Sequence, residues 1–333
     1  GLTYGIQQAG INVVAGYDID EKSKFAYEYN NDAKFILKDI KEIEDDEILG
    51  LYPSDTDIKV LIGCAPCQPF STYSHKYQNN ENTKKKIDLL DCFGRQVELV
   101  KPDIVSMENV PQMQKREVFH RFRTLLEKNG YKVTYKVVYA PDYGVPQTRK
   151  RLLLLASKFG DISLIEPEFN SDTHPTLRDT IGKLPEIRAG ETYEHDPLHR
   201  SRNLSDLNLK RIRQSKPGGT WRDWPEELIL KCHKKKTGRS YSSVYGRMQW
   251  DDVAPTITTQ FIGYGTGRFG HPEQDRALTL REGAMLQTFP VNYSFVPEGE
   301  EVILKIIARH IGNAVPPRLG EIIGLSIKKH CFK

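Results

Sequence analysis

Apolar residues follow helical and extended spacing in turn over the first 160 residues of this 333-residue chain. Three- and four-residue spacing predicts helices over residues 2–9, 21–30, 89–100 and 118–126. Alternating or short apolar runs predict strands over residues 12–17, 60–62, 104–107, 133–139 and 152–156. Regular alternation of strand and helix is typical of an α/β fold with a doubly wound, mostly parallel sheet. Ligands bind such a sheet at the carboxyl ends of its strands, so residues directly after strands are the first candidates for chemistry.

The hydrophobic pattern changes near residue 160. Helical spacing is scarce up to about residue 275, where Pro, Gly, Arg, Lys and aromatic residues are frequent, and it returns over residues 277–288 and from 301 onward. We therefore predict a large domain formed by residues 1–160 together with 300–333. A second, smaller domain spans residues 161–275, and a connecting region spans 276–299.

Composition narrows the class of protein. Hydrophobic residues make up 38 % and charged residues 28 % of the chain, which is an ordinary globular mixture. No apolar run approaches the roughly 20 residues of a membrane span. Five cysteines at irregular spacing are not typical of a disulfide framework and favour a reducing cytoplasmic location. A net charge of +4 neither requires nor excludes a nucleic acid, so the distribution of charge matters more than its sum.

The strongest chemical signal is the segment Gly-Cys-Ala-Pro-Cys-Gln-Pro-Phe-Ser at residues 63–71, directly after the strand at 60–62. Its prolines stiffen the loop, and a thiolate presented at the end of a strand would be a nucleophile. The pair Cys64 and Cys67 alone would also suit a redox site or half of a zinc site. No second close pair of Cys or His residues completes a zinc site, and we predict no bound metal.

Four motifs in order resemble the DNA cytosine-C5 methyltransferase family. They are Pro-Cys-Gln-Pro-Phe-Ser at residues 66–71, Glu-Asn-Val at 108–110, Gln-Thr-Arg-Lys-Arg at 147–151 and Gly-Asn-Ala-Val-Pro at 312–316. The resemblance runs from end to end, and only residues 160–245 carry none of it. It implies a sheet of the S-adenosylmethionine-dependent methyltransferase type, with the second domain serving DNA recognition. It also implies transfer of a methyl group from S-adenosyl-L-methionine to C5 of cytosine in double-stranded DNA.

The reaction explains the residue types in these motifs. C5 of cytosine is a poor nucleophile, but covalent attack at C6 makes it enamine-like. The resemblance implies that Cys67 attacks C6 and that Glu108 binds the N3 edge of the ring. Arg149 and Arg151 match the family's paired arginines, which hold the cytosine O2 and the cysteine loop; their alternate spacing places them on one face of an extended segment. The alternatives are a surface carboxylate and two solvated arginines, and the sequence names no final base.

Five residues match the family's cofactor site, namely Asp18, Ile19, Asp39, Pro66 and Asn313. The resemblance places the two aspartates near the ribose and the adenine amino group, and Ile19 against the adenine. For the aspartates, turn or helix capping is the alternative. The family opens with a strand and a glycine-rich turn, and this sequence begins at what matches the turn's last residue. We therefore expect a sheet without its first strand and weak cofactor binding by this chain.

The expected recognition domain carries three features suited to DNA. Lys234 and Lys235 lie in a basic stretch at residues 231–239, Arg268 lies in the glycine-rich stretch 263–270, and Arg247 precedes a segment, 250–259, that resembles a family motif. A solvated basic face or a mobile surface loop is the alternative for each. A cytosine paired inside a duplex could not reach Cys67, so we expect it to be flipped out.

The family's commonest role is to protect DNA from a partner restriction endonuclease that acts on the same site, and a stand-alone or regulatory enzyme is the alternative. No extra regulatory domain is visible in the sequence, which favours a compact microbial enzyme. Two rival functions stay open. A tRNA cytosine-C5 methyltransferase would carry Cys-Phe-Thr in its smaller domain, whereas here Cys-Phe-Lys lies at residues 331–333. A catalytically inactive DNA-binding fragment is the other rival.

Overall fold

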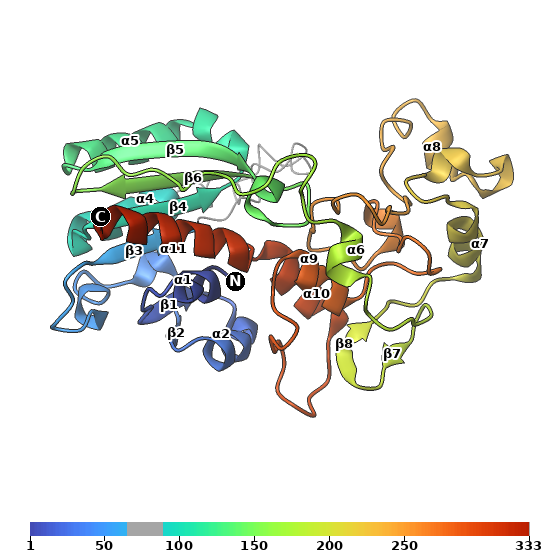
Figure 1. Ribbon diagram of the computed structural model, residues 1–333, viewed down its shortest axis with the longest axis horizontal. Coiled ribbons are helices and arrows are strands. Elements are labelled where there is room, and N and C mark those ends of the chain that lie inside the picture. Colours follow the sequence, from blue (N-terminus) through green and yellow to red (C-terminus); the bar gives the residue numbers. More distant parts are fainter. Residues whose placement is uncertain (65–88, 333) are drawn as a thin grey trace. The chain divides into compact units, whose positions relative to one another are not determined.

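The computed structural model describes residues 1–64 and 89–332, so the predictions for Pro66 and Cys67 lie outside the described residues. The chain forms two compact units (Figure 1). Unit 1 comprises Gly1–Tyr143, Lys150–Pro167 and Pro317–Lys333, and unit 2 comprises Gly144–Arg149 and Glu168–Pro316. These ranges differ from the predicted division, because residues 276–316 cluster with unit 2 and only the last helix returns to unit 1.

The described residues of unit 1 form six strands in two sheets. β1 (Ala15–Asp18) pairs in parallel with β2 (Lys34–Leu37). The other sheet has the order β3-β4-β6-β5, from β3 (Val60–Gly63), β4 (Ile104–Asn109), β5 (Lys132–Tyr139) and β6 (Lys150–Ser157).

This four-stranded sheet is mixed, which corrects the expectation of a mostly parallel sheet. β3 and β4 are parallel, but β6 runs antiparallel to both β4 and β5. The reason is local: the short connection between β5 and β6 contains only the 3-10 helix Ala140–Tyr143 and an extended segment. A connection without a crossover helix returns the chain antiparallel to the strand it left.

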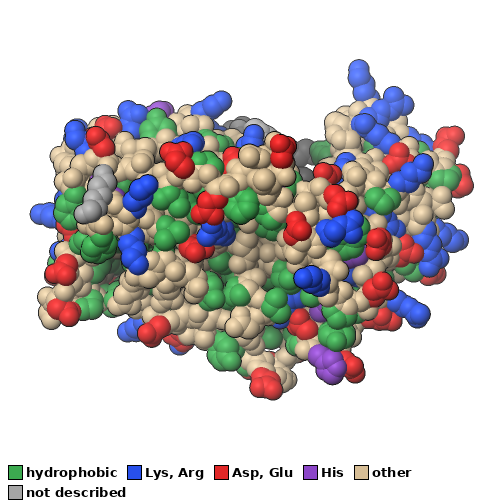
Figure 2. Space-filling view, in the orientation of Figure 1, with side chains coloured by type: hydrophobic (Ala, Val, Ile, Leu, Met, Phe, Trp, Pro, Cys, Tyr) green, Lys and Arg blue, Asp and Glu red, His purple; other side chains and the backbone are tan. Residues whose placement is uncertain are grey.

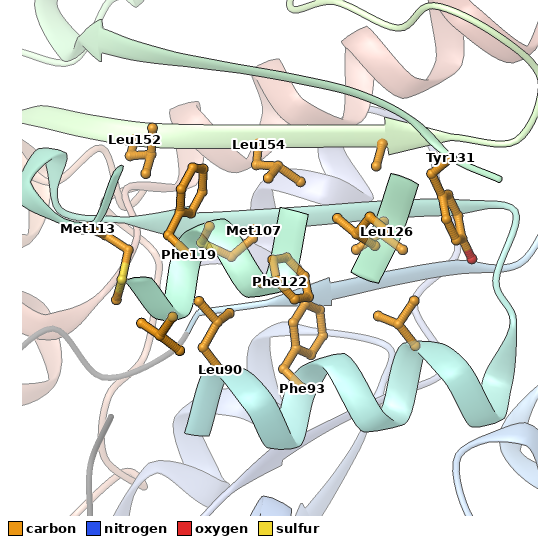
Figure 3. Close-up of a cluster of buried hydrophobic side chains, with 14 of the residues drawn as sticks. Leu90, Phe93, Met107, Met113, Phe119, Phe122, Leu126, Tyr131, Leu152 and Leu154 are labelled. Atoms are coloured by element: carbon orange, nitrogen blue, oxygen red, sulfur yellow. The ribbon is translucent and has the colours of Figure 1, made fainter. Parts of the chain in front are cut away.

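Helices cover the four-stranded sheet and form its core. Residues of α4 (Leu89–Val100) and α5 (Glu117–Lys128) pack with the sheet in one hydrophobic cluster, in which Phe93, Phe122 and Met107 meet (Figure 3). The predicted helical spacing therefore corresponds to a real apolar face. The first helices are α1 (Leu2–Gln8) and α2 (Lys24–Asn30).

The chain ends in α11 (Pro317–Cys331), which packs closely along α1. A side chain at Gly5 would come within 2.0 Å of the Pro317 carbonyl oxygen, so this contact requires glycine. Ser157 on β6 and His330 on α11 are hydrogen-bonded at 2.8 Å. The last helix is thereby fixed to the sheet as well as to α1.

Unit 2 has little regular structure for its size. Its elements are α6 (Leu177–Ile181), β7 (Thr192–Tyr193), β8 (Asp196–Arg200), α7 (Asp206–Gln214), α8 (Lys231–Lys234), α9 (Leu280–Leu286) and α10 (Leu304–Asn313). Short 3-10 helices complete both units, at Glu21–Ser23, Ile40–Glu42, Leu49–Leu51, Pro111–Lys115, Trp221–Asp223, Glu226–Leu228 and Tyr264–Thr266. None of the helices in the described part of the chain is both long and apolar enough to cross a bilayer.

Buried polar groups hold unit 2 together alongside an aromatic cluster. Arg276 and Glu282 form a fully buried, two-pronged ion pair with both N–O distances at 2.8 Å. Burial alone would raise the pKa of Glu282, but Arg276 outweighs it and lowers that pKa to about 2. Trp221, Trp224 and Tyr264 form the core of the cluster that packs beneath α7 and α8. Contacts of this kind join residues far apart in the sequence and leave no helical spacing of apolar residues. The hydrophobic pattern therefore did not predict the short helices of this unit.

Candidate active site and DNA interface

Glu108 stands near the carboxyl end of β4, in a strand whose six residues are all buried. The parallel neighbour β3 ends at Gly63, which pairs with Met107. Cys64, the next residue, is exposed. The chain therefore leaves β3 beside Glu108 and enters the segment that carries Cys67, which lies outside the described residues.

Arg151 forms an ion pair with Glu108. The distance from Arg151 Nε to Glu108 Oε1 is 2.7 Å, and the two side chains are 13 % and 10 % exposed. The antiparallel register explains the contact: Glu108 lies opposite Leu153, so Arg151 is its diagonal neighbour on the same face of the sheet. Arg151 Nη1 also donates to the Lys150 carbonyl at 2.8 Å. The arrangement fixes a carboxyl group and a cation at the end of adjacent strands.

Arg149 belongs to unit 2 and is 3 % exposed. Its segment runs beside Ala254, since Thr148 N donates to the Ala254 carbonyl at 2.8 Å and Ala254 N donates to the Pro146 carbonyl at 3.0 Å. The guanidinium donates to the Ile257 carbonyl at 3.1 Å and to the Ala314 carbonyl at 3.5 Å. Arg149 is therefore a fixed, buried cation rather than a solvated one.

Three cofactor candidates lie together in unit 1. Asp18 ends β1 opposite Leu37 of β2, so residues 18–19 and 38–39 occupy the carboxyl ends of paired parallel strands. Ile19 is 72 % exposed, which is unusual for isoleucine. Asp18 Oδ1 accepts from Asp20 N, and Asp39 Oδ1 accepts from Lys41 N and caps a 3-10 helix. The capping alternative is thus real for both aspartates, and it occupies one oxygen of each.

Asn313 is the exposed last residue of α10 in unit 2. The helix approaches another backbone closely just before it: a side-chain carbon at Gly312 would lie 2.4 Å from the Thr258 carbonyl carbon. Glycine is therefore required at this position, and the contact places the end of α10 against residues 258–259.

The prediction that Arg247 contacts DNA is corrected by its environment. Arg247 is 4 % exposed, and each of its five N–H donors has an acceptor at 2.8 to 3.0 Å. The acceptors are four carbonyl oxygens and one carboxylate, from Ile212, Ser215, His271, Gln274 and Asp275. A saturated, buried guanidinium joins segments of unit 2 and has no donor left for DNA.

Lys234 and Lys235 are exposed at the end of α8. Lys and Arg side chains gather over the part of unit 2 that carries α7 and α8 (Figure 2). The basic stretch is tied down at its far end, because Trp221 Nε1 donates to the Tyr241 carbonyl and Arg222 donates to the Arg239 carbonyl, both at 2.8 Å. Lys234 is partly neutralised by Glu226 at 3.1 Å, whereas no acid of the described residues pairs with Lys235.

Arg268 is half-buried and lines a small hollow of unit 2. Ser243, Gln249 and Asp252 share the lining, so hydrogen-bond donors and acceptors both line the hollow. Metal ligands are a different matter: within residues 1–64 and 89–332, no three His, Cys, Asp or Glu side chains gather into a candidate metal site.

The sequence model of the family of C-5 cytosine-specific DNA methylases matches residues 1–329, nearly the whole chain. The chain belongs to this family. As a member, the protein is a DNA (cytosine-5)-methyltransferase.

Two relatives of this methylase are similar to it over most of their length. The chain is 52 % identical over 332 residues to the Type II methylase M.HgiDII of Herpetosiphon aurantiacus, covering 99 % of this chain and 92 % of the relative. It is 29 % identical to the Type II methyltransferase M1.HphI of Haemophilus parahaemolyticus, covering 99 % and 84 %. A prophage-encoded E. coli protein described as a DNA modification methyltransferase has the same fold, with a TM-score of 0.73 at 21 % identity and coverage of 100 % and 96 %.

Two buried residues of the methylase near Arg149 were not among the predicted site residues. Gln147 and Gln287 are both fully buried and hydrogen-bonded to each other at 2.9 Å. Gln147 lies in the quoted motif at residues 147–151, and its period-two relation to Arg149 was the available signal. Gln287 had no such signal, because it lies 138 positions from Arg149 in the sequence.

Proposed function

We propose that this methylase transfers a methyl group from S-adenosylmethionine to C5 of a flipped-out cytosine in a short, specific duplex site. The reaction passes through a covalent bond between Cys67 Sγ and C6 of the base. Glu108, Arg149 and Arg151 are the other catalytic residues. The observation that carries this proposal is the buried contact of Arg151 with Glu108 at the end of β4.

The contact prepares a carboxyl group for the edge of a cytosine ring. Arg151 Nε lies 2.7 Å from Oε1 of Glu108, and in this proposal Oε2 serves the base. Ionised, Oε2 accepts from the 4-amino group; protonated, the carboxyl donates to N3. The positive charge of Arg151 balances the negative charge that builds on the ring when a nucleophile adds at C6.

Chain connectivity supports a nucleophile at the same edge in this proposal. Cys67 follows Cys64 by three residues, and a stretch of that length spans at most about 11 Å. The thiolate adds to C6, and the electron pair moves toward C5, which then takes the methyl group. The sulfonium donor would lose that methyl with cleavage of its carbon–sulfur bond and leave as a neutral thioether. Loss of the C5 proton to a base returns electrons to the ring, and the carbon–sulfur bond breaks to restore the thiolate.

The residues at the ends of β1 and β2 fit the expected methyl donor. Asp18 and Asp39 each keep one carboxylate oxygen for a ribose hydroxyl or an adenine amino group, and the exposed Ile19 offers an apolar surface to a ring. Pro66 and Asn313 complete the proposed set. Bound there, S-adenosylmethionine would supply an electrophilic methyl group on a sulfonium.

DNA is held, in this proposal, by unit 2 as a target recognition domain. Lys235, Lys234 and their basic neighbours would contact phosphates, which give affinity without sequence preference. Arg268 is the proposed base-reading residue, because a guanidinium can bond two acceptors on a guanine edge. Arg247 is not part of this interface.

The biological role we infer is protection of DNA from a restriction endonuclease that acts on the same site. The relatives M.HgiDII and M1.HphI carry Type II methylase names, which support this role. A bacterial cytoplasm would house such an enzyme.

The function is tested by incubating the protein with S-adenosylmethionine and a mixed-sequence plasmid, then mapping 5-methylcytosine by bisulfite sequencing. We expect methylation at one short motif on duplex DNA and none on tRNA. Methylation of tRNA alone would favour the rival enzyme, and no methyl transfer to either would favour an inactive DNA-binding fragment.

Two variants test the site residues. Cys67→Ser removes the thiolate and Glu108→Gln keeps the size of the side chain, and we expect each to lose methylation while still binding the duplex. A control variant, Cys232→Ser, changes an exposed cysteine of unit 2 and is expected to keep full activity. Full activity in Cys67→Ser would refute the covalent mechanism.

A further inference from the structure

Arg149 is part of a closed ring of hydrogen bonds in unit 2. Arg149 donates to the Ile257 carbonyl at 3.1 Å, and Ile257 N donates to Gln147 Oε1 at 3.0 Å. Gln147 Nε2 donates to Gln287 Oε1 at 2.9 Å. Gln287 Nε2 donates to the Ala314 carbonyl at 3.4 Å, the same oxygen that Arg149 Nη2 approaches at 3.5 Å.

The chemistry of the neighbours fixes the orientation of both amides. Gln287 Nε2 also donates to the Ile311 carbonyl at 2.5 Å, and Gln147 Nε2 donates to the Leu286 carbonyl at 2.7 Å. Turning either amide around would set oxygen against a carbonyl oxygen. The ring therefore has one consistent arrangement, and it joins the 147–149 segment to α9 and α10.

The three side chains of this network are buried, since Gln147 and Gln287 are 0 % exposed and Arg149 is 3 % exposed. Buried amides without partners are costly, so the bonds hold each member strictly in place. The side chain of Gln287 is fully enclosed by this network. It shares the Ala314 carbonyl, next to Asn313, with the guanidinium of Arg149.

We propose that Gln287 is a positioning residue for the methyl transfer, acting through Arg149. The inference rests on the proposed function, in which Arg149 touches the cytosine or the cysteine loop. Without the amide donor, the Ala314 carbonyl loses the hydrogen bond from Gln287, and the guanidinium that donates to the same carbonyl is held less firmly. Because small displacements of a catalytic group cost large factors in rate, the chemical step slows while DNA binding is preserved.

The test measures single-turnover methyl transfer with enzyme in excess over a duplex oligonucleotide and saturating S-adenosylmethionine. Under these conditions the rate constant is independent of any inactive fraction. Gln287→Met, which keeps the size of the side chain and removes the amide, is expected to lower the rate constant at least tenfold. The dissociation constant for the duplex, measured without S-adenosylmethionine, is expected to change less than threefold.

A double-mutant cycle separates positioning from a general loss of structure. Once Arg149→Ala has removed the guanidinium, adding Gln287→Met is expected to lower the rate less than twofold further; Arg149→Lys replaces Arg149→Ala if the latter does not fold. Ser326→Ala, which removes the hydroxyl that accepts a part-buried hydrogen bond from Ile165 N in unit 1, serves as a destabilised control with a normal rate constant. Equal losses from Gln287→Met in both backgrounds, or a normal rate in Gln287→Met alone, would overturn the inference. If Arg149→Ala itself keeps the full rate, the proposed role of Arg149 fails first, and the inference fails with it.

Discussion

Replacing Arg247 by methionine tests whether this side chain is structural. The substitution keeps an unbranched side chain but removes all five N–H donors and the positive charge. Four carbonyl oxygens then lose a partner, and each buried unsatisfied group costs about 1–3 kcal/mol. The sum is an upper bound, because carbonyls keep a second lone pair and water can enter. The partner carboxylate of Asp275 is 38 % exposed, so solvent screening reduces its share.

We therefore expect Arg247→Met to lower the free energy of unfolding by about 3–5 kcal/mol, the usual cost of removing one member of a buried charged network. For a unit of this size, about 2–4 °C per kcal/mol translates the loss into a Tm lower by roughly 6–20 °C. Differential scanning calorimetry measures the shift. The control Arg239→Met changes an exposed arginine in the same unit and is expected to stay within about 0.5 kcal/mol of wild type.

DNA binding supplies the decisive comparison. The slope of log affinity against log salt falls by about 0.9 for each phosphate contact removed. We expect an unchanged slope for folded Arg247→Met and a smaller slope for Lys235→Ala. If Arg247→Met unfolds at the wild-type temperature and binds DNA with a reduced salt slope, Arg247 is a phosphate contact and the structural assignment is wrong.

Three further perturbations follow from the structure. Burial lowers the pKa of His271 to about 4, so as pH falls the unfolded chain takes up a proton before the folded chain does. The free energy of unfolding should therefore fall by up to roughly 3 kcal/mol between about pH 6.5 and pH 4. Urea titrations at pH 7 and pH 5 should show this loss, and His271→Gln should abolish most of it. Gly312→Ala forces a carbon against backbone 2.4 Å away and is expected to cost about 1–3 kcal/mol in thermal unfolding, whereas Gly50→Ala, with nothing within 4 Å, should be neutral; equal Tm values for the two variants would contradict the packing. Arg151→Lys replaces a planar donor by a point charge beside Glu108 and is expected to slow methyl transfer at least tenfold with little change in duplex affinity; an unchanged rate constant would show that the shape of the guanidinium is irrelevant.

Local patterns in the sequence determined most elements of unit 1. The apolar spacing of residues 89–100 and 118–126 became α4 and α5, because a helix with one apolar stripe has few other ways to bury it. The sequence motifs likewise identified the family, since a cysteine after one strand and a glutamate after the next are readable without coordinates. Glu108 is indeed near the end of its strand.

Only the tertiary structure decided which charged residues contact one another. Arg151 reaches Glu108 through an antiparallel register, and the sequence pattern had favoured parallel strands. Arg247 was predicted to contact DNA because it precedes a segment that resembles a family motif, yet its five acceptors come from residues 24 to 35 positions away. Gln287 was not predicted as a site residue, because Gln147 and the other residues of its network are distant in the sequence or belong to the backbone. Periodicity encodes how a segment buries its own apolar face, whereas the partners of a buried polar side chain depend on how distant segments meet.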